Sequence, residues 1–117
     1  TTDGGAASIA VFDLDHFKEI NDVHGHGAGD TVLQTAAARM REAIGERGQL
    51  FRYGGEEFVA VLPGSDSDRA AALAEEGRAA LTASTIGGLA ITTSSGVVSR
   101  AMTRAATLRP VGLASST

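Results

Sequence analysis

The chain has 117 residues, 43% of them hydrophobic and 21% charged, which suits one domain with a modest core and leaves too little for two domains. It contains no cysteine, which excludes a disulfide framework, a thiolate zinc site and a cysteine nucleophile. The formal net charge of -4 argues against a duplex-binding protein, so we expect no nucleic-acid partner. No apolar run approaches the roughly 20 residues of a membrane span, so we expect no membrane segment in residues 1–117.

The first part of the chain is predicted to form a strand and two helices. The apolar run Ser8–Phe12 is typical of a buried strand, and it leads directly into acidic residues. Residues His16–Val23 have apolar side chains at helical spacing, including Val23 itself, with Asp15 as the expected N-cap; three glycines then interrupt the pattern. A longer amphipathic helix is predicted over Asp30–Ile44, with glycines at its end.

A β-hairpin is predicted next. Two strand-like runs, Leu50–Tyr53 and Glu56–Leu62, flank the dipeptide Gly54-Gly55. Adjacent glycines permit the positive φ angles of a two-residue turn, so we expect a tight hairpin with the glycines at its tip.

The remaining sequence predicts one helix and one strand. A helix is expected over Ala70–Leu81 with a cap at Asp66, and a strand over Leu89–Val98. Residues Ala101–Leu108 have the composition of one or two helical turns. The order of strand, two helices, hairpin, helix and strand predicts an α/β fold in which helices cover a mainly antiparallel central sheet.

Two carboxylates stand at the end of the first predicted strand. Asp13 and Asp15 are two residues apart, so in a continuing strand they project to the same side, with the Leu14 carbonyl between them. Mg²⁺ prefers oxygen ligands, which makes this a candidate nucleotide-metal site. The alternative is that Asp15 caps the following helix and Asp13 is merely solvated.

Two further acids follow the glycine pair. Glu56 and Glu57 point to opposite faces of a strand, so only one of them can join Asp13. If the hairpin pairs beside the first strand, that glutamate completes a carboxylate cluster next to glycines that allow a ligand close to the backbone. Otherwise both acids belong to an ordinary solvated hairpin.

Other possible sites are less specific. Lys18, the only lysine, either meets a phosphate held at the helix N-terminus or pairs with Asp22 one turn later. The segment Gly25–Asp30 fails the dinucleotide-loop pattern at its last position, and no P-loop occurs. His24 and His26 lack a third histidine or a cysteine at zinc spacing.

Taken together, three blocks resemble the GGDEF domain of diguanylate cyclases, here in its GGEEF form. The blocks are Phe12–Asp22, Gly25–Asp30 and Arg52–Phe58; the resemblance covers about residues 8–98 and leaves 99–117 as a divergent tail. It implies an α/β, palm-like sandwich related to class III nucleotidyl cyclases and polymerase palms. It also implies the condensation of two GTP into cyclic di-GMP, with release of pyrophosphate, by a homodimer in which each domain holds one GTP.

The resemblance also implies a set of site residues. The implied metal ligands, for Mg²⁺ or Mn²⁺, are Asp13, the Leu14 carbonyl and Glu56; the implied catalytic residues are Glu56, Glu57 and Lys18; the implied substrate contacts are His16, Phe17, Lys18, Asn21, Asp30, Gly54 and Gly55. Asn21 and Asp30 are expected to recognise guanine, and Lys18 with the helix start to hold phosphates. A sensory or receiver domain outside this chain is implied too, with a cytoplasmic location, including as the cytoplasmic part of a membrane-bound sensor.

The chain also departs from the family. Nothing before Ser8 matches the opening pocket segment, and Ala101–Thr117 lacks the basic closing helix. Ser95 stands where an apolar residue usually packs, and the inhibitory Arg-x-x-Asp motif would fall on Gly45 and Gly48, so we expect no product-feedback site. We therefore expect little cyclase activity from the chain as given, and keep as the alternative a catalytically weak or truncated GTP-binding, regulatory interaction module.

Overall fold

The computed structural model describes residues 6–101, with side chains over 7–98, and within them four strands form one antiparallel sheet. The strands are β1 (Ala6–Leu14), β2 (Gln49–Arg52), β3 (Glu57–Pro63) and β4 (Thr93–Ala101), in the order β2-β3-β1-β4. This confirms the expected sheet. The register of β1 with β3 places Asp13 opposite Glu57, so the acidic end of β1 lies beside the hairpin acids.

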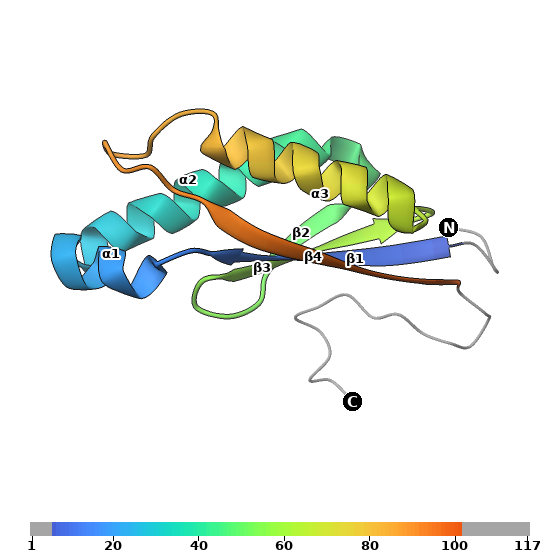
Figure 1. Ribbon diagram of the computed structural model, residues 1–117, viewed down its shortest axis with the longest axis horizontal. Coiled ribbons are helices and arrows are strands. Elements are labelled where there is room, and N and C mark those ends of the chain that lie inside the picture. The colour runs from blue at the N-terminus through green and yellow to red at the C-terminus, as the bar shows by residue number, and fades with distance from the viewer. Residues whose placement is uncertain (1–5, 102–117) are drawn as a thin grey trace.

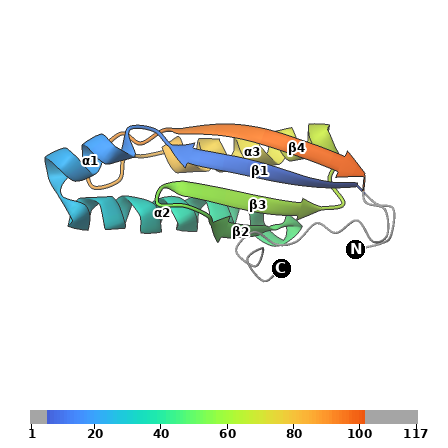
Figure 2. The same cartoon turned by 90° about the horizontal axis from the view of Figure 1, so that it is seen from below.

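Helices cover one face of the sheet (Figures 1 and 2). Helices α1 (Phe17–His24) and α2 (His26–Ile44) follow β1, a 3₁₀ turn η1 (Gly45–Arg47) follows α2, and α3 (Ser67–Thr82) joins β3 to β4. In Figure 1, α2 and α3 lie over the sheet, whereas α1 extends past the end at which β1 finishes. Across residues 6–101, no helix has the length and apolar character that crossing a membrane requires.

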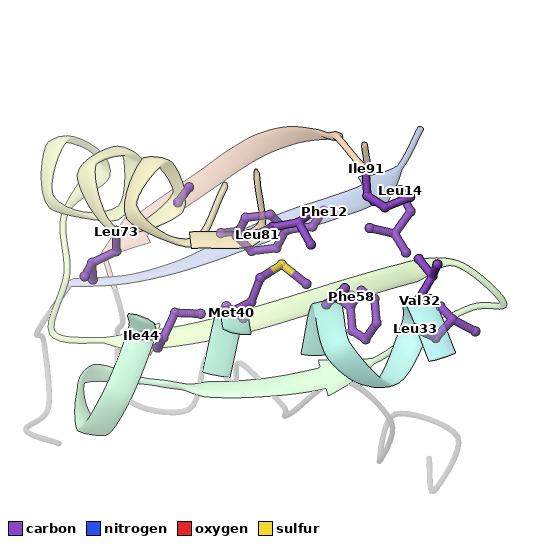
Figure 3. Close-up of a cluster of buried hydrophobic side chains, with 14 of the residues drawn as sticks. Phe12, Leu14, Val32, Leu33, Met40, Ile44, Phe58, Leu73, Leu81 and Ile91 are labelled. Carbon is purple, nitrogen blue, oxygen red and sulfur yellow. The ribbon is translucent and has the colours of Figure 1, made fainter. Parts of the chain in front are cut away.

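The core between sheet and helices follows from the alternation of side chains in the strands. Ala10, Phe12 and Leu14 are fully buried, and Phe12 lies opposite Phe58 of β3 (Figure 3). The helices add buried side chains at helical spacing, namely Val32, Leu33, Ala36, Met40 and Ile44 from α2 and Ala70, Leu73, Ala74 and Leu81 from α3. Because neighbouring strand residues face opposite sides, this packing turns Asp13 away from the apolar core.

The structure corrects the prediction for the first two helices. Helix α2 begins at His26, four residues before the predicted start at Asp30, so two of the glycines expected to interrupt the pattern lie inside a helix. Val23, one of the apolar residues at helical spacing, is 73% exposed, because α1 lies at the end of the sheet and buries only Phe17. Asp15 is not the N-cap of α1: His16 holds that position with a φ of 60°, and no side chain caps the helix.

Strand β4 begins at Thr93 instead of Leu89, because the chain first makes a tight turn. Gly87 and Gly88 have φ angles of 58° and 84°, a conformation that glycine adopts without a steric penalty. Leu89 and Ile86 exchange backbone hydrogen bonds of 2.9 Å in both directions. Gly87 and Gly88 therefore form a two-residue turn, which the sequence predicted for Gly54 and Gly55 and not for this pair.

The boundaries around α3 agree with the sequence in part. The Asp66 side chain accepts a hydrogen bond from the backbone N–H of Arg69 at 2.9 Å, which confirms the predicted cap, and the helix starts at Ser67, three residues before Ala70. Of the helical turns predicted over Ala101–Leu108, Ala101 belongs to β4 and the rest lie outside the described residues.

Candidate functional site

Asp13, near the end of β1, is the centre of the candidate site. Its Oδ1 is buried and has no hydrogen-bond partner among the described residues. The backbone around it is fixed: the Thr93 hydroxyl donates to the Asp13 carbonyl at 2.9 Å, and the Leu14 N–H donates to the Glu56 carbonyl at 3.1 Å. A buried carboxylate oxygen without a donor is costly, which makes this oxygen a candidate cation ligand.

Glu56 brings a second carboxylate to Asp13. It lies in the loop between β2 and β3, at the same end of the sheet as the end of β1 (Figure 1). Partial burial raises the pKa of Glu56, and the charges of Asp13 and Glu57 raise it further. Two carboxylates this close repel one another unless a proton or a cation lies with them, so the pair fits a hard divalent cation.

The β2–β3 loop differs from the predicted two-residue turn. It runs over residues 53–56, and neither Gly54 nor Gly55 has a positive φ, so the tight-hairpin prediction is wrong. The Arg52 guanidinium shapes the loop by donating to the carbonyls of Gly54 at 3.3 Å and Gly55 at 2.9 Å. Gly54 provides space instead, since a Cβ there would lie 2.9 Å from Oε1 of Glu57.

Replacing Glu56 tests this carboxylate pair in the metal-free protein. Because the pKa of Glu56 is raised in the folded state, its ionisation opposes folding; the penalty is absent below the ordinary glutamate pKa and complete above the raised one. Glu56→Gln should therefore raise the melting temperature slightly at neutral pH without Mg²⁺, and this gain should vanish in acid. Thermal unfolding across pH measures it, with Glu42→Gln on exposed α2 surface as control. An equal gain at every pH would contradict the pairing.

Asp15 anchors the β1–α1 loop to β4. Its Oδ2 accepts a hydrogen bond from the Thr92 hydroxyl and its Oδ1 one from the Ser94 hydroxyl, both at 2.7 Å, and its N–H donates to the Thr92 carbonyl at 2.9 Å. These hydroxyls lower the pKa of Asp15, because they stabilise its ionised form. The prediction that Asp15 caps the helix is therefore wrong, and its carboxylate instead binds the hydroxyls at residues 92 and 94. Its pairing with Asp13 at a metal stays a prediction.

Sequence reasoning missed Thr92 and Ser94, although their alternation at the start of a strand was a usable signal. Residues two apart in a strand point to the same side, so two hydroxyls can reach one carboxylate. Ser95, the hydroxyl in place of an apolar residue, is exposed.

The predicted phosphate contacts lie at the start of α1. Lys18 Nζ lies 3.0 Å from Asp22 Oδ2, with 85% of the lysine side chain exposed, so the surface pair expected as the alternative is formed. Phe17 is buried, which leaves its backbone as the part available to a ligand. His16 is exposed and its Nδ1 lies 3.5 Å from Oε1 of Glu19. Lys18 remains free to turn toward a phosphate, since an exposed ion pair is weak.

The predicted guanine pair lies where α1 meets α2. The Asn21 side chain packs against Gly29, where a Cβ would lie 1.9 Å from Asn21 Oδ1. Asp30, the next residue, lines a cavity of about 230 Å³ between α2 and β2. The other residues lining this cavity are Leu33, Gln34, Ala37, Arg41, Leu50, Arg52 and Phe58. The fold thus brings Asn21 to the segment that carries Asp30.

The predicted histidines and a second cavity lie apart from the Asp13 and Glu56 carboxylates. Within residues 6–101, no three or more His, Asp or Glu side chains are grouped so as to hold a metal ion, and this includes the histidines His24 and His26. A larger cavity of about 710 Å³ lies at the far end of β3, lined in part by Arg47 and Pro63. There Arg47 donates to the Ile44 carbonyl at 3.1 Å and to Glu76 at 2.8 Å.

Comparison with known proteins decides the family. Residues 2–108, nearly the whole chain, match the family described as "Diguanylate cyclase, GGDEF domain". The chain belongs to the GGDEF family. This confirms the resemblance noted from the sequence, and the nucleotidyl-cyclase-like α/β fold agrees with it.

Several relatives are named as diguanylate cyclases. The chain is 46% identical over 81 residues to the diguanylate cyclase DgcP of Pseudomonas aeruginosa, covering 69% of this chain and 12% of DgcP. Among solved structures, the active GGEEF domain of a diguanylate cyclase from Vibrio cholerae matches with a TM-score of 0.76 and 34% identity, covering 82% of this chain and 63% of that one. The diguanylate cyclase SiaD, solved with its activator SiaC from P. aeruginosa, matches with a TM-score of 0.78 and 33% identity over 85% of this chain and 40% of SiaD.

Proposed function

We propose that this GGDEF domain binds one GTP with Mg²⁺ and that two copies together condense two GTP into cyclic di-GMP, releasing pyrophosphate. The observation that carries the proposal is the pairing of Asp13, with its unsatisfied buried oxygen, and Glu56, whose pKa is raised by partial burial and by the charge of Asp13. The family membership and the diguanylate cyclase relatives support the same activity.

The donor set suits a divalent cation. Asp13 and Glu56 supply two carboxylates, and the Leu14 carbonyl, on the residue after Asp13, supplies a neutral oxygen. Hard divalent cations prefer oxygen ligands, and their remaining coordination positions are filled by phosphate oxygens and water. Mg²⁺ or Mn²⁺ held there would polarise the α-phosphate and neutralise the leaving pyrophosphate.

The protein's own groups bind and orient the nucleotide. Lys18 and the backbone N–H groups at the start of α1 hold the phosphates, since a helix N-terminus attracts anions. Asn21 and Asp30 bind the guanine edge, and Gly54 and Gly55 let the substrate approach the loop.

The chemical step needs two domains. The 3′-oxygen of each GTP attacks the α-phosphorus of the other, so two bonds form; in each attack the bond from the α-phosphorus to the bridging oxygen of the β-phosphate breaks and one pyrophosphate leaves. One of the two carboxylates, Glu56 at the end of the loop or Glu57 at the start of β3, takes the proton from each attacking hydroxyl. Each domain contributes one such half-site, so the pairing of two copies sets the rate by orienting the reactants.

We further propose that control lies in that pairing and that the domain works in the cytoplasm, where GTP is available. The solved complex of SiaD with its activator shows that a related diguanylate cyclase binds a regulatory protein. The chain spans only 12% of the length of DgcP, so the regulation of a whole protein built around this domain is part of the proposal.

Calorimetric titration with a non-hydrolysable GTP analogue, with and without Mg²⁺, tests the binding half of this proposal. We expect binding that requires Mg²⁺; its absence in both titrations would overturn the proposal. Incubation with GTP and Mg²⁺ followed by chromatography for cyclic di-GMP and pyrophosphate tests the other half. Analogue binding without any product, at concentrations where two copies associate, would favour a GTP-binding module over a cyclase.

A further inference from the structure

The contact between α1 and α2 depends on one glycine inside a helix. Gly29 is the fourth residue of α2 and is buried. A Cβ at this position would lie 1.9 Å from Oδ1 and 2.9 Å from Cγ of Asn21, and 3.2 Å from Cζ of Phe17. Real Cβ atoms do not approach other heavy atoms to 1.9 Å, so Asn21 can keep this place only while residue 29 has no side chain.

Helix propensity does not explain the glycine. Gly29 lies in a regular helix, where alanine is the more stable residue, and its φ is not in the left-handed region. Gly27 lies in the same turn, yet a Cβ there would have nothing within 4 Å. The two glycines thus share a backbone conformation and differ in what faces them.

The group that occupies the space is polar and available. Within residues 6–101 the Asn21 side-chain amide has no protein hydrogen-bond partner, whereas the Asn21 carbonyl accepts the N–H of Gly25 at 2.8 Å and so fixes the end of α1. The amide rests on the backbone of Gly29, next in sequence to Asp30. An amide supplies both donors and an acceptor and a carboxylate supplies acceptors, which are the groups that recognition of a purine edge requires.

We propose that Gly29 is a positioning residue for base recognition: its missing side chain seats the Asn21 amide beside Asp30, and so sets the selectivity for guanine. This inference rests on the proposed function. Asn21 is short and half-exposed, so an added methyl group displaces its amide by rotating the side chain and leaves α2 intact.

The test uses Gly29→Ala with Gly27→Ala as its matched control. Gly29→Ala should remain folded and lose about tenfold to a hundredfold in affinity for a non-hydrolysable GTP analogue with Mg²⁺, with a smaller loss for the ATP analogue, because a recognition hydrogen bond is removed. Gly27→Ala should bind both analogues as the parent does. Unchanged affinity and selectivity in Gly29→Ala would overturn the inference.

A double-mutant cycle separates positioning from general damage. In the Asn21→Ala background, Gly29→Ala should have almost no further effect on nucleotide affinity, because the group it displaces is gone. Equal losses in the parent and Asn21→Ala backgrounds would show that Gly29 acts through the fold alone and would contradict the proposal.

A readout without nucleotide distinguishes failure of this inference from failure of the proposed function. The side-chain NH₂ resonances of Asn21 should shift in Gly29→Ala and stay in place in Gly27→Ala. A parent that binds no GTP analogue overturns the function, whereas unshifted Asn21 resonances in Gly29→Ala overturn the positioning role.

Discussion

Asp13→Asn is expected to abolish Mg²⁺-dependent nucleotide binding while the domain stays folded. The change removes one charged oxygen ligand from a pair that a divalent cation would hold together, and losses of at least tenfold in metal affinity follow from much smaller disturbances of metal sites. Folding should not suffer, because the substitution also removes the repulsion between Asp13 and Glu56, which contributes to the raised pKa of Glu56.

Calorimetry with Mg²⁺ and the non-hydrolysable GTP analogue measures the effect, and circular dichroism melting checks the fold. Glu42→Gln is the matched control, because it removes the same charge from an exposed position near the end of α2. An Asp13→Asn variant that binds Mg²⁺ and the analogue as tightly as the parent would show that the carboxylate site is misassigned.

The place of Asp13 could be predicted from local sequence because it follows from strand geometry. The run Ser8–Phe12 indicated a buried strand, and the condition that the hairpin pairs beside it is met by the register of Asp13 with Glu57. The amphipathic pattern of Asp30–Ile44 likewise predicted most of α2, because five buried side chains repeat at helical spacing.

The role of Asp15 could not be predicted locally, because its partners are far away in the chain. Thr92 and Ser94 lie 77 and 79 residues from Asp15 in sequence. A carboxylate before a helix is most simply interpreted as a cap. Only the pairing of β4 with β1 shows that two hydroxyls reach this carboxylate and bind it instead.

The glycines were misjudged for a related reason. Sequence rules treat glycine as a source of unusual φ angles, which holds for Gly87 and Gly88. At Gly29 and Gly54 the glycine instead makes room for a polar side chain from another part of the fold, Asn21 in one case and Glu57 in the other. Such space depends on tertiary contacts, so the start of α2 and the shape of the β2–β3 loop were both predicted wrongly.

The second large effect concerns the base. Because Asn21 and Asp30 are proposed to bind the guanine edge, the GTP analogue should bind at least ~100-fold more tightly than the ATP analogue in the presence of Mg²⁺. Adenine presents a donor where guanine presents an acceptor. With adenine, a donor of the protein would therefore face another donor, and a second polar group of the protein would be left without a hydrogen-bond partner. Polar mismatches of this type are rejected much more strongly than differences in apolar size.

Competition titrations with the two analogues measure this ratio of affinities, and the variant Asp30→Asn tests whether the selectivity depends on Asp30. Since phosphates and Mg²⁺ bind the two nucleotides alike, losing the Asp30 carboxylate should weaken the GTP analogue and leave the ATP analogue nearly unchanged, so the ratio falls. Equal affinity of the parent for both analogues would defeat the assignment of the pair. A variant that weakens both analogues equally would place the effect of Asp30 on the phosphate end or on the fold, and guanine recognition would then have to come from other residues of the cavity.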